Sequence, residues 1–230
     1  MVNIKIGTRA SELAVWQAKK VQEKLKEINV SSSIVQISSS GDKDLSKPIY
    51  ELGITGVFTK EIDVALINKE VDIAVHSLKD VPTVLPKGVI QSAVLKRGTE
   101  KDILIINKEL QESNNTIATG SLRRKAQWLN KYKSDNIIPI RGNVVTRLKK
   151  LKESNWTGTI MAKAGLERLN LIPVNYMDLD WMIPAPGQGA ISIQNLAEND
   201  LITEITKKIN HCETEMCTNI ERAFLNKLEG

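Results

Sequence analysis

Residues 4–28 read IKIGTRASELAVWQAKKVQEKLKEI, and their pattern decides the fold. Ile4 and Ile6 alternate with polar residues, which predicts a strand, and the apolar residues of 13–28 recur at helical spacing. Between them lies a short loop that ends on Ser11, a residue type that often caps a helix. The segment therefore predicts a strand, a tight loop and an amphipathic helix capped by Ser11.

The same order of elements returns along the chain. We expect further strands at 34–37, 71–75, 103–106, 116–118, 137–140 and 158–161, and helices at 57–67, 122–132 and 144–151. Strands that alternate with helices are typical of mainly parallel sheets with helices on both faces. The predicted fold class is therefore α/β.

Two stretches of sequence are candidate domain boundaries and suggest two domains. One is the polar stretch 96–99, and the other is the Pro- and Gly-rich stretch 183–189. If residues 190–193 form a strand that returns to the first sheet, the chain crosses twice between the domains and can form a hinged cleft. We expect domain 1 to comprise residues 1–96 and 189–210, and domain 2 to comprise residues 97–183.

Composition excludes several classes of protein. A chain of 230 residues has the length of one or two domains. No apolar run approaches the roughly 20 residues that span a bilayer. The N-terminus lacks the pattern of a signal peptide. Cys212 and Cys217 have only His211 nearby, which is too few ligands for a structural zinc and gives no disulfide framework. We expect a folded, cytoplasmic protein without a metal site.

Positive charge gathers where a ligand would bind. The chain has 32 Lys and Arg against 27 Asp and Glu, a net charge of +5, which favours an anionic partner. Cationic side chains follow five predicted strands: Arg9, Lys79, Arg123 with Arg124, Arg141, and Lys163 with Arg168. Any one of them alone is typical of a solvated surface, but the carboxyl ends of parallel strands meet at one edge of a sheet. We therefore expect a ligand with several negative charges.

Arginine pairs bidentately with carboxylate or phosphate, so both anions fit this array. A phosphate loop would favour nucleotides, but neither G-x-x-x-x-G-K-[ST] nor G-x-G-x-x-G occurs in the chain. Residues 53–56 and 187–189 lack the required lysine or third glycine. Nucleotide chemistry is therefore disfavoured.

Two further residues follow the strand at 71–75. Asp80 is a carboxylate amid cations, which favours its ionised form and suits it to stabilise a cationic intermediate or to move a proton. The alternative is that Asp80 caps the turn before Pro82. His76 has no Cys or Asp partner at catalytic spacing, and we interpret it as structural. The lysines of 149–152 fit a solvated helix face better than a nucleic-acid patch.

Six segments resemble, in order and spacing, the porphobilinogen deaminase (hydroxymethylbilane synthase) family. They are IGTRASELA at 6–14, VFTKE at 57–61, DIAVHSLKDVP at 72–82, SLRR at 121–124, RGNV at 141–144 and PGQGA at 186–190. The likeness covers essentially the whole chain, and the segments at 76–82, 123–124 and 141–143 are highly specific.

The resemblance implies a three-domain transferase of heme and other tetrapyrrole biosynthesis. Its first two domains resemble the type II periplasmic-binding-protein fold, with mainly parallel sheets around a cleft that holds the active site. Such an enzyme joins four porphobilinogen molecules head to tail, releases ammonia each time and yields hydroxymethylbilane. Each pyrrole has an acetate and a propionate, which would be the carboxylates that the arginines bind.

The resemblance also implies roles for individual residues. Asp80 would be the catalytic carboxylate that stabilises the cation formed when ammonia leaves, and Phe58 would lie on a mobile lid. The residues that would bind the carboxylates of cofactor and growing chain, or support that binding, are Arg9, Ser11, Gln17, Ser77, Lys79, Ser121, Arg123, Arg124, Arg141, Arg147, Arg168 and Gln188.

The chain departs from the family pattern at two places. Residues 53–56 read GITG where the family often has a lysine, so the sequence offers no lysine at these positions for a basic contact from the lid. Residues 221–230 read ERAFLNKLEG, which in the family continues into the Gly-Cys that bears the covalent dipyrromethane cofactor. We expect residues 211–230 to begin a truncated third domain, Cys212 and Cys217 to be structural, and this chain to have little or no turnover.

Two other functions stay open. A non-catalytic clamshell that binds a polycarboxylate would keep the arginines without needing an ionisable Asp80. A nucleic-acid binder fits less well, because the cations follow strands and do not line an exposed helix with interleaved aromatics. We expect porphobilinogen as the partner of a monomer that binds neither nucleic acid nor membrane.

Overall fold

The computed structural model describes residues 3–38, 58–107 and 115–229. The described residues form two compact units. The first unit contains residues 3–38, 58–98 and 186–229, and the second contains residues 99–107 and 115–185. The chain therefore leaves the first unit near Gly98 and returns to it near Pro186.

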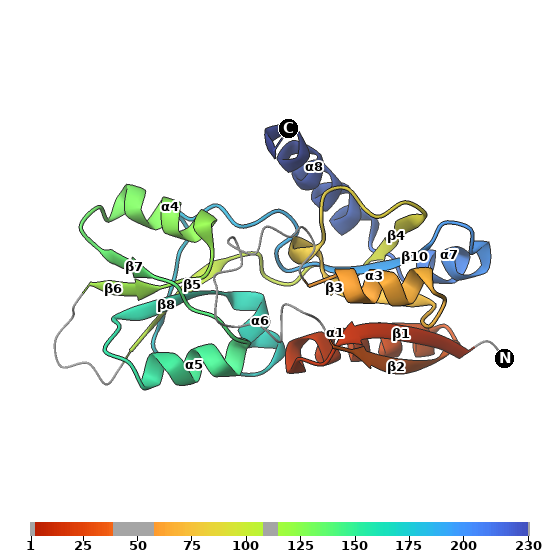
Figure 1. Ribbon diagram of the computed structural model, residues 1–230, viewed down its shortest axis with the longest axis horizontal. Coiled ribbons are helices and arrows are strands. Elements are labelled where there is room, and N and C mark those ends of the chain that lie inside the picture. Colours follow the sequence, from red (N-terminus) through yellow and green to blue (C-terminus); the bar gives the residue numbers. More distant parts are fainter. Residues whose placement is uncertain (1–2, 39–57, 108–114, 230) are drawn as a thin grey trace. The chain divides into compact units, whose positions relative to one another are not determined.

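The first unit contains a five-stranded sheet in the order β2-β1-β3-β10-β4 (Figure 1). The strands are β1 (Asn3–Arg9), β2 (Ser31–Ile37), β3 (Ile73–Ser77), β4 (Val89–Val94) and β10 (Ile191–Leu196). β1 is parallel to β2 and β3, whereas β10 is antiparallel to both β3 and β4. Four strands therefore point the same way, and the returning strand is the reversed one.

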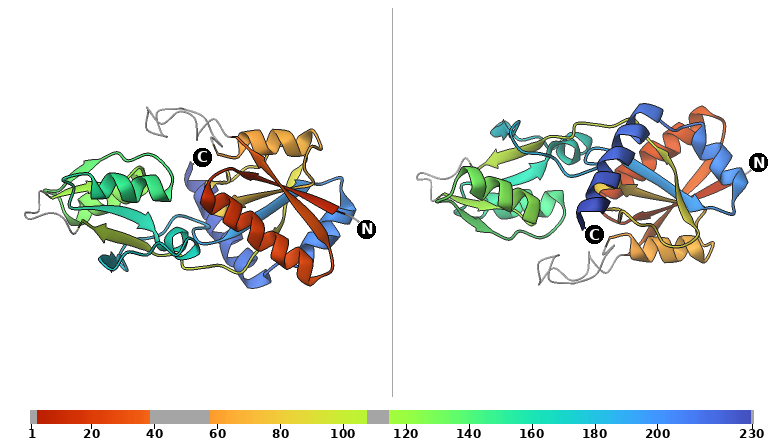
Figure 2. Two further views of the ribbon diagram at one scale, coloured as in Figure 1. Left: turned by 90° about the horizontal axis from the view of Figure 1, so that it is seen from below. Right: turned by 90° about the horizontal axis from the view of Figure 1, so that it is seen from above.

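Helices cover both faces of this sheet, as Figure 2 shows for α1 and α3. The helices of the unit are α1 (Glu12–Glu27), α3 (Lys60–Ile67), α7 (Asp200–Lys207) and α8 (Cys212–Glu229), with a short 3-10 turn η2 (Leu78–Asp80). Val21 of α1 and Ile202 of α7 pack with Ile4, Ile6 and other strand residues in one core cluster. The helix α3 packs with Ala74 and Val89 in a second cluster. Successive side chains of a strand point to opposite faces, so the strands contribute apolar residues to the core on each face of the sheet.

The second unit contains another five-stranded sheet, in the order β7-β6-β8-β5-β9. Its strands are β5 (Asp102–Ile106), β6 (Thr116–Ala118), β7 (Asn136–Ile138), β8 (Gly158–Ala162) and β9 (Tyr176–Asp178). β6 is parallel to β7 and β8, and β5 is antiparallel to β8 and β9. Here too one strand of the described sheet is reversed.

The helices of the second unit are α4 (Leu122–Lys131), α5 (Val144–Lys152) and α6 (Lys163–Arg168). Trp128 of α4 packs with Leu104 and Ile160 in one core cluster. Leu151 of α5 and Leu166 of α6 pack with Ile103 and Met161 in the other. Because α4 and α5 cover opposite faces, as Figure 1 shows, the sheet is buried on both sides.

The predicted fold class is confirmed, because both sheets consist mainly of parallel strands covered by helices. The sequence pattern missed β4, β9, α6 and α7, and it placed β3 two residues too early. Ser11 lies at the N-cap of α1, but its side chain makes no capping hydrogen bond. The capping role predicted for Ser11 is therefore wrong, and a backbone bond from Val15 to the Ser11 carbonyl begins the helix.

Candidate active site

The carboxyl ends of β1 and β3 in the first unit enclose a small pocket of about 60 Å³. It is lined by Arg9, Ser11, Leu13, Ala14, Gln17, Phe58, Val75, His76, Ser77 and Asp80. Strand β1 contributes Arg9, and α1 contributes Ser11 at its N-cap and Gln17 further along the helix. The end of β3 and η2 contribute His76, Ser77 and Asp80. Six residues that the sequence predicts for the site therefore meet in one place: Arg9, Ser11, Gln17, Phe58, Ser77 and Asp80.

Arg9 is held by an aromatic contact. Its guanidinium carbon lies 4.3 Å from the centroid of the Phe58 ring, which is the geometry of a cation–π interaction. The ring supports one face of the guanidinium, while guanidinium N–H groups point outward in the plane of the fork. Phe58 thus aligns an arginine suited to bind a carboxylate.

The neutral polar residues on the α1 side of the pocket are bonded to each other. Gln17 is buried, and its Nε2 donates to Ser77 Oγ at 2.8 Å. This bond ties the middle of α1 to the last residue of β3. It fixes the Ser77 hydroxyl at the point where the chain turns into η2 and Asp80.

Asp80 lies at the end of η2, and backbone contacts fix that turn. The Leu78 N–H donates to the Ala190 carbonyl at 3.0 Å, and Val81 N–H donates back to the Leu78 carbonyl at 3.1 Å. Gly187 has a φ of +71°, and a Cβ there would lie 2.8 Å from Leu78 Cγ. Only glycine fits this left-handed position against the buried Leu78 side chain.

The last helix supports the same turn. Arg222 of α8 donates from its guanidinium to the carbonyl oxygens of Val81 and Pro82, at 2.8 and 2.5 Å. Partial burial lowers the pKa of the Arg222 guanidinium. The residues directly after Asp80 are therefore bonded to a helix more than a hundred positions away in the chain.

Lys79 and Gln188 lie close to each other in the first unit. Lys79 Nζ donates to Gln188 Oε1 at 3.4 Å, and the Gln188 carbonyl accepts from Arg97 Nε at 2.8 Å. Gln188 is fully buried. Both residues were predicted for the site, and neither lines the pocket around Arg9.

His76 also lines the pocket, although the sequence suggested only a structural residue. Its side chain is buried, and its Nε2 has no hydrogen-bond partner among the described residues. Burial, together with the positive charge of Arg9, lowers the pKa of His76 to about 4. The imidazole is therefore neutral at neutral pH.

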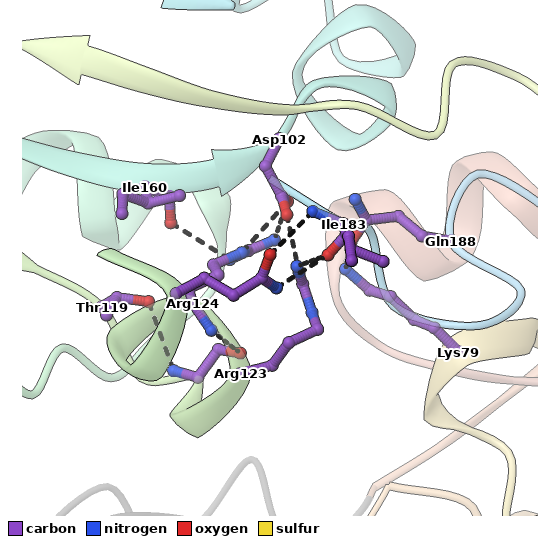
Figure 3. A network of polar contacts seen from close by, with 10 residues as sticks. Lys79, Asp102, Thr119, Arg123, Arg124, Ile160, Ile183 and Gln188 are labelled. Carbon is purple, nitrogen blue, oxygen red and sulfur yellow. Dashed lines mark hydrogen bonds and ion pairs between the residues drawn. The ribbon is translucent and has the colours of Figure 1, made fainter. Parts of the chain in front are cut away.

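In the second unit, Arg123 and Arg124 share one buried carboxylate (Figure 3). Asp102 is fully buried, with one oxygen 2.7 Å from Arg123 Nη2 and the other 2.7 Å from Arg124 Nη2. Arg124 Nη1 also donates to the Ile160 carbonyl at 3.1 Å. Burial alone would raise the pKa of the Asp102 carboxyl, but the charges of Arg124 and Arg123 lower it below its usual range.

The remaining predicted residues lie in the loops and helices that follow β6, β7 and β8 of the second unit. The Ser121 hydroxyl caps α4 by accepting from Arg124 N–H, and Asn143 caps α5. Arg147 Nε donates to the Gly142 carbonyl at 2.8 Å, next to the buried Arg141. Arg168 ends α6, and burial lowers its pKa to about 10, so it stays protonated at neutral pH.

Sequence reasoning missed several charged partners. Asp102 begins the apolar strand β5, and nothing in its local pattern shows that two arginines bind it. Lys163, one of the cations expected to bind an anionic ligand, pairs with Asp178 at 2.9 Å. The predicted segment at 53–56 lies outside the described residues.

The part of the chain that the structure describes contains neither a membrane-spanning helix nor a cluster of metal-ligating side chains. No helix there is both long and apolar enough to cross a membrane. The same residues contain no group of three or more His, Cys, Asp or Glu side chains placed to hold a metal ion.

The fold belongs to the periplasmic-binding-protein-like class of α/β proteins. The chain resembles the VFT2 domain of Bordetella pertussis BvgS with a TM-score of 0.51 at 10% identity, over 96% of this chain and 90% of that one. It resembles the Salmonella typhimurium periplasmic binding protein STM4351 with a TM-score of 0.51 at 12% identity, over 99% and 98%. Identities this low show the fold alone.

The chain belongs to the porphobilinogen deaminase family. Residues 4–204 match the family model described as "Porphobilinogen deaminase, dipyromethane cofactor binding domain". A probable porphobilinogen deaminase of Methanocaldococcus jannaschii is 42% identical over 99% of this chain and 79% of its own length. The porphobilinogen deaminase of Desulfitobacterium hafniense is 41% identical over 100% of this chain and 77% of its own length.

Proposed function

We propose that this chain binds porphobilinogen and takes part in joining four of these molecules head to tail into hydroxymethylbilane, with release of ammonia. The observation that supports this proposal best is the pocket that holds Arg9 and Asp80 together. A pyrrole with acetate and propionate arms needs a carboxylate-binding cation and an acceptor for its ring N–H. This pocket contains both.

Asp80 is the group that acts on the reacting pyrrole. When ammonia leaves the aminomethyl carbon of porphobilinogen, positive charge spreads over the ring to its nitrogen. A carboxylate that accepts a hydrogen bond from this N–H stabilises the charge as it develops. The backbone bonds that fix η2 and the residues after it hold Asp80 in place for this task.

Arg9 binds and orients a carboxylate arm, and the Phe58 ring keeps its guanidinium aligned. Ser11, Gln17 and Ser77 supply neutral donors around it. In the second unit, Arg123 and Arg124 are held by Asp102, which fixes their planes and restricts their rotamers. We propose that Arg141, Arg147 and Arg168 bind further carboxylates, with Ser121, Lys79 and Gln188 as supporting contacts.

The donor set of this chain fits dipyrromethane, which has two linked pyrroles with four carboxylates. In the second unit, guanidinium groups come after β6, after β7 and after β8, and their fork-shaped donors match carboxylates. When bound, dipyrromethane supplies the pyrrole carbon to which the first porphobilinogen is attached. Arg141, Arg147 and Arg168 would hold its acetate and propionate groups.

We further propose that residues 211–230, whose helix α8 packs with the first unit, also open a third domain. Met216, Ile220, Phe224 and Leu228 of α8 recur every fourth residue, and each is 65–69% exposed. This spacing places them on one face of the helix. A contiguous apolar face is where another domain packs, and the curated relatives are longer than the matched region.

We also propose a cytoplasmic monomer that binds neither nucleic acid nor membrane. Arg9 lies in a pocket, and Arg123 and Arg124 bind one buried carboxylate, so these charges do not form an array along an exposed helix face. Lys149 is mostly exposed, and its partner is Glu153 on the same helix face. This arrangement fits a solvated helix surface.

Calorimetry with porphobilinogen tests the proposal. We expect the native chain to bind porphobilinogen, and to bind its dimethyl ester at least about tenfold more weakly, because charge-assisted hydrogen bonds contribute roughly 1.5–3 kcal/mol each. Equal affinity for the two compounds, or no binding of either, would contradict the proposal.

A substitution separates the enzyme from a non-catalytic binding protein. In a full-length relative, replacing the aspartate equivalent to Asp80 by asparagine should abolish most hydroxymethylbilane formation while porphobilinogen still binds. Unchanged turnover would favour a polycarboxylate-binding module, the alternative that the periplasmic-binding-protein-like fold keeps open.

A further inference from the structure

His76 differs from the other polar residues of the pocket in the first unit. Its side chain is 4% exposed and lines the same pocket as Arg9 and Asp80. Gln17 and Ser77 bond to each other, whereas His76 Nε2 has no partner among the described residues. A buried polar atom without a partner destabilises a fold, so such an atom in a pocket calls for a functional explanation.

The imidazole is a neutral group with one N–H and one lone pair. Burial first, and then the positive charge of Arg9, lowers its pKa to about 4. An apolar residue such as phenylalanine would fill a comparable volume without leaving a nitrogen unbonded. Packing alone therefore does not explain a histidine at this position.

A neutral donor has a specific advantage four residues before Asp80. A lysine or arginine there could pair with the Asp80 carboxylate and compete with the substrate for it. A neutral imidazole can donate to an anionic ligand without neutralising Asp80. Arg9 then supplies the positive charge, and the imidazole N–H of His76 orients the anionic ligand.

We propose that His76 Nε2 donates a hydrogen bond to one carboxylate arm of the pyrrole substrate, beside Arg9. The inference rests on the proposed function and assigns a further substrate-positioning residue to it. It predicts that the pocket recognises this arm by one cation and one neutral donor.

Nuclear magnetic resonance of ¹⁵N-histidine-labelled chain tests the contact directly. The chain contains two histidines, so each imidazole is resolved without ambiguity. His211 is an internal reference, because its Nδ1 accepts from the Thr214 N–H at 3.2 Å in α8. On addition of porphobilinogen, we expect the His76 Nε2 resonance to shift and the His211 resonances to stay unchanged.

Three substitutions of His76 distinguish a hydrogen bond from a filled volume. Glutamine can place an N–H near the position of Nε2, asparagine can reach only the position of Nδ1, and phenylalanine keeps volume alone. We expect porphobilinogen affinity to fall at least about tenfold in His76→Phe and His76→Asn, and to recover substantially in His76→Gln. His211→Gln is the control, and circular dichroism checks that each variant folds.

The outcomes separate this inference from the proposed function. If calorimetry shows that the native chain binds porphobilinogen while the His76 resonances stay unchanged, the inference is wrong and the function stands. Equal affinity of His76→Phe and the native chain would also overturn it. If the native chain does not bind porphobilinogen, the proposed function and this inference fall together.

Discussion

Glu221 of α8 bonds to Arg97 and to the backbone of Gly187, so one carboxylate holds both segments by which the chain leaves and re-enters the first unit. Its two oxygens lie 2.5 and 3.2 Å from Arg97 Nη1 and Nη2, and Gly187 N–H donates to it at 2.8 Å. The Arg97 N–H also donates to Thr214 Oγ1 of α8. This helix therefore fixes the start of the PGQGA segment.

Removing the charge of Glu221 should destabilise the first unit. We expect Glu221→Gln to lower the free energy of unfolding by about 1–3 kcal/mol, because it weakens hydrogen bonds to a partly buried guanidinium. Chemical denaturation measures the change. Glu213→Gln, at an exposed position of the same helix, is the matched control and should change stability by less than about 0.5 kcal/mol. Equal effects of the two substitutions would contradict the role of Glu221.

Asp102 should matter more to stability than an exposed carboxylate does. Asp102→Asn leaves two arginines without their shared counter-charge, one of them buried, and we expect a loss of about 3–5 kcal/mol. Asp180→Asn is the control, since Asp180 pairs with Lys101 at the surface. The native pair has a characteristic pH dependence. Because the folded pKa of Asp102 is lowered, its contribution is complete above the unfolded pKa of about 3.9 and is lost as the pH falls through the folded value.

His76 should make the fold sensitive to mild acid. Its pKa is about 4 in the folded chain, against about 6.5 in the unfolded chain, so the unfolded chain takes up the proton first. The contribution of neutral His76 to the free energy of unfolding is then fully present above pH 6.5. It decreases as the pH falls toward 4, by at most about 3 kcal/mol. Denaturation between pH 7 and 4.5 should show a steeper loss in the native chain than in His76→Phe. Parallel curves would contradict this prediction.

The apolar face of α8 should bind a hydrophobic dye. We expect Phe224→Asp to reduce fluorescence of an anilinonaphthalene dye, with a change in unfolding free energy of less than about 0.5 kcal/mol, because Phe224 is 65% exposed. Ile202→Ala, at a buried position of α7, should cost about 2–4 kcal/mol and serves as the contrast. A large loss of stability in Phe224→Asp would show that this face is already packed.

Local sequence patterns predicted the elements that define the fold. Ile4 and Ile6 alternate with polar residues because successive side chains of a strand point to opposite faces, and these two pack in one core cluster. The residues of α1 follow the helical period because one face of the helix packs on the sheet. Strand β9 spans Tyr176–Asp178 alone, too short for any period to appear. Its place in the sheet depends on pairing with β5.

The site was predictable where residues follow strand ends, and less so where partners meet through the fold. The position of Arg9 follows from β1, and that of Asp80 from β3 and η2. The pairing of Asp102 with Arg124 joins residues 22 positions apart, and no local pattern specifies it. The neutral state of His76 likewise depends on burial by the assembled first unit, which sequence spacing does not reveal.

The reversed strand β10 has a consequence for the order of folding. It lies between β3 and β4, so the first sheet lacks an interior strand until residues 191–196 have been synthesised. The strands of the second sheet all come from residues 102–178 and leave the ribosome earlier. Domains tend to fold as units during synthesis. The second unit can therefore complete its sheet before β10, which pairs with both β3 and β4, has been synthesised.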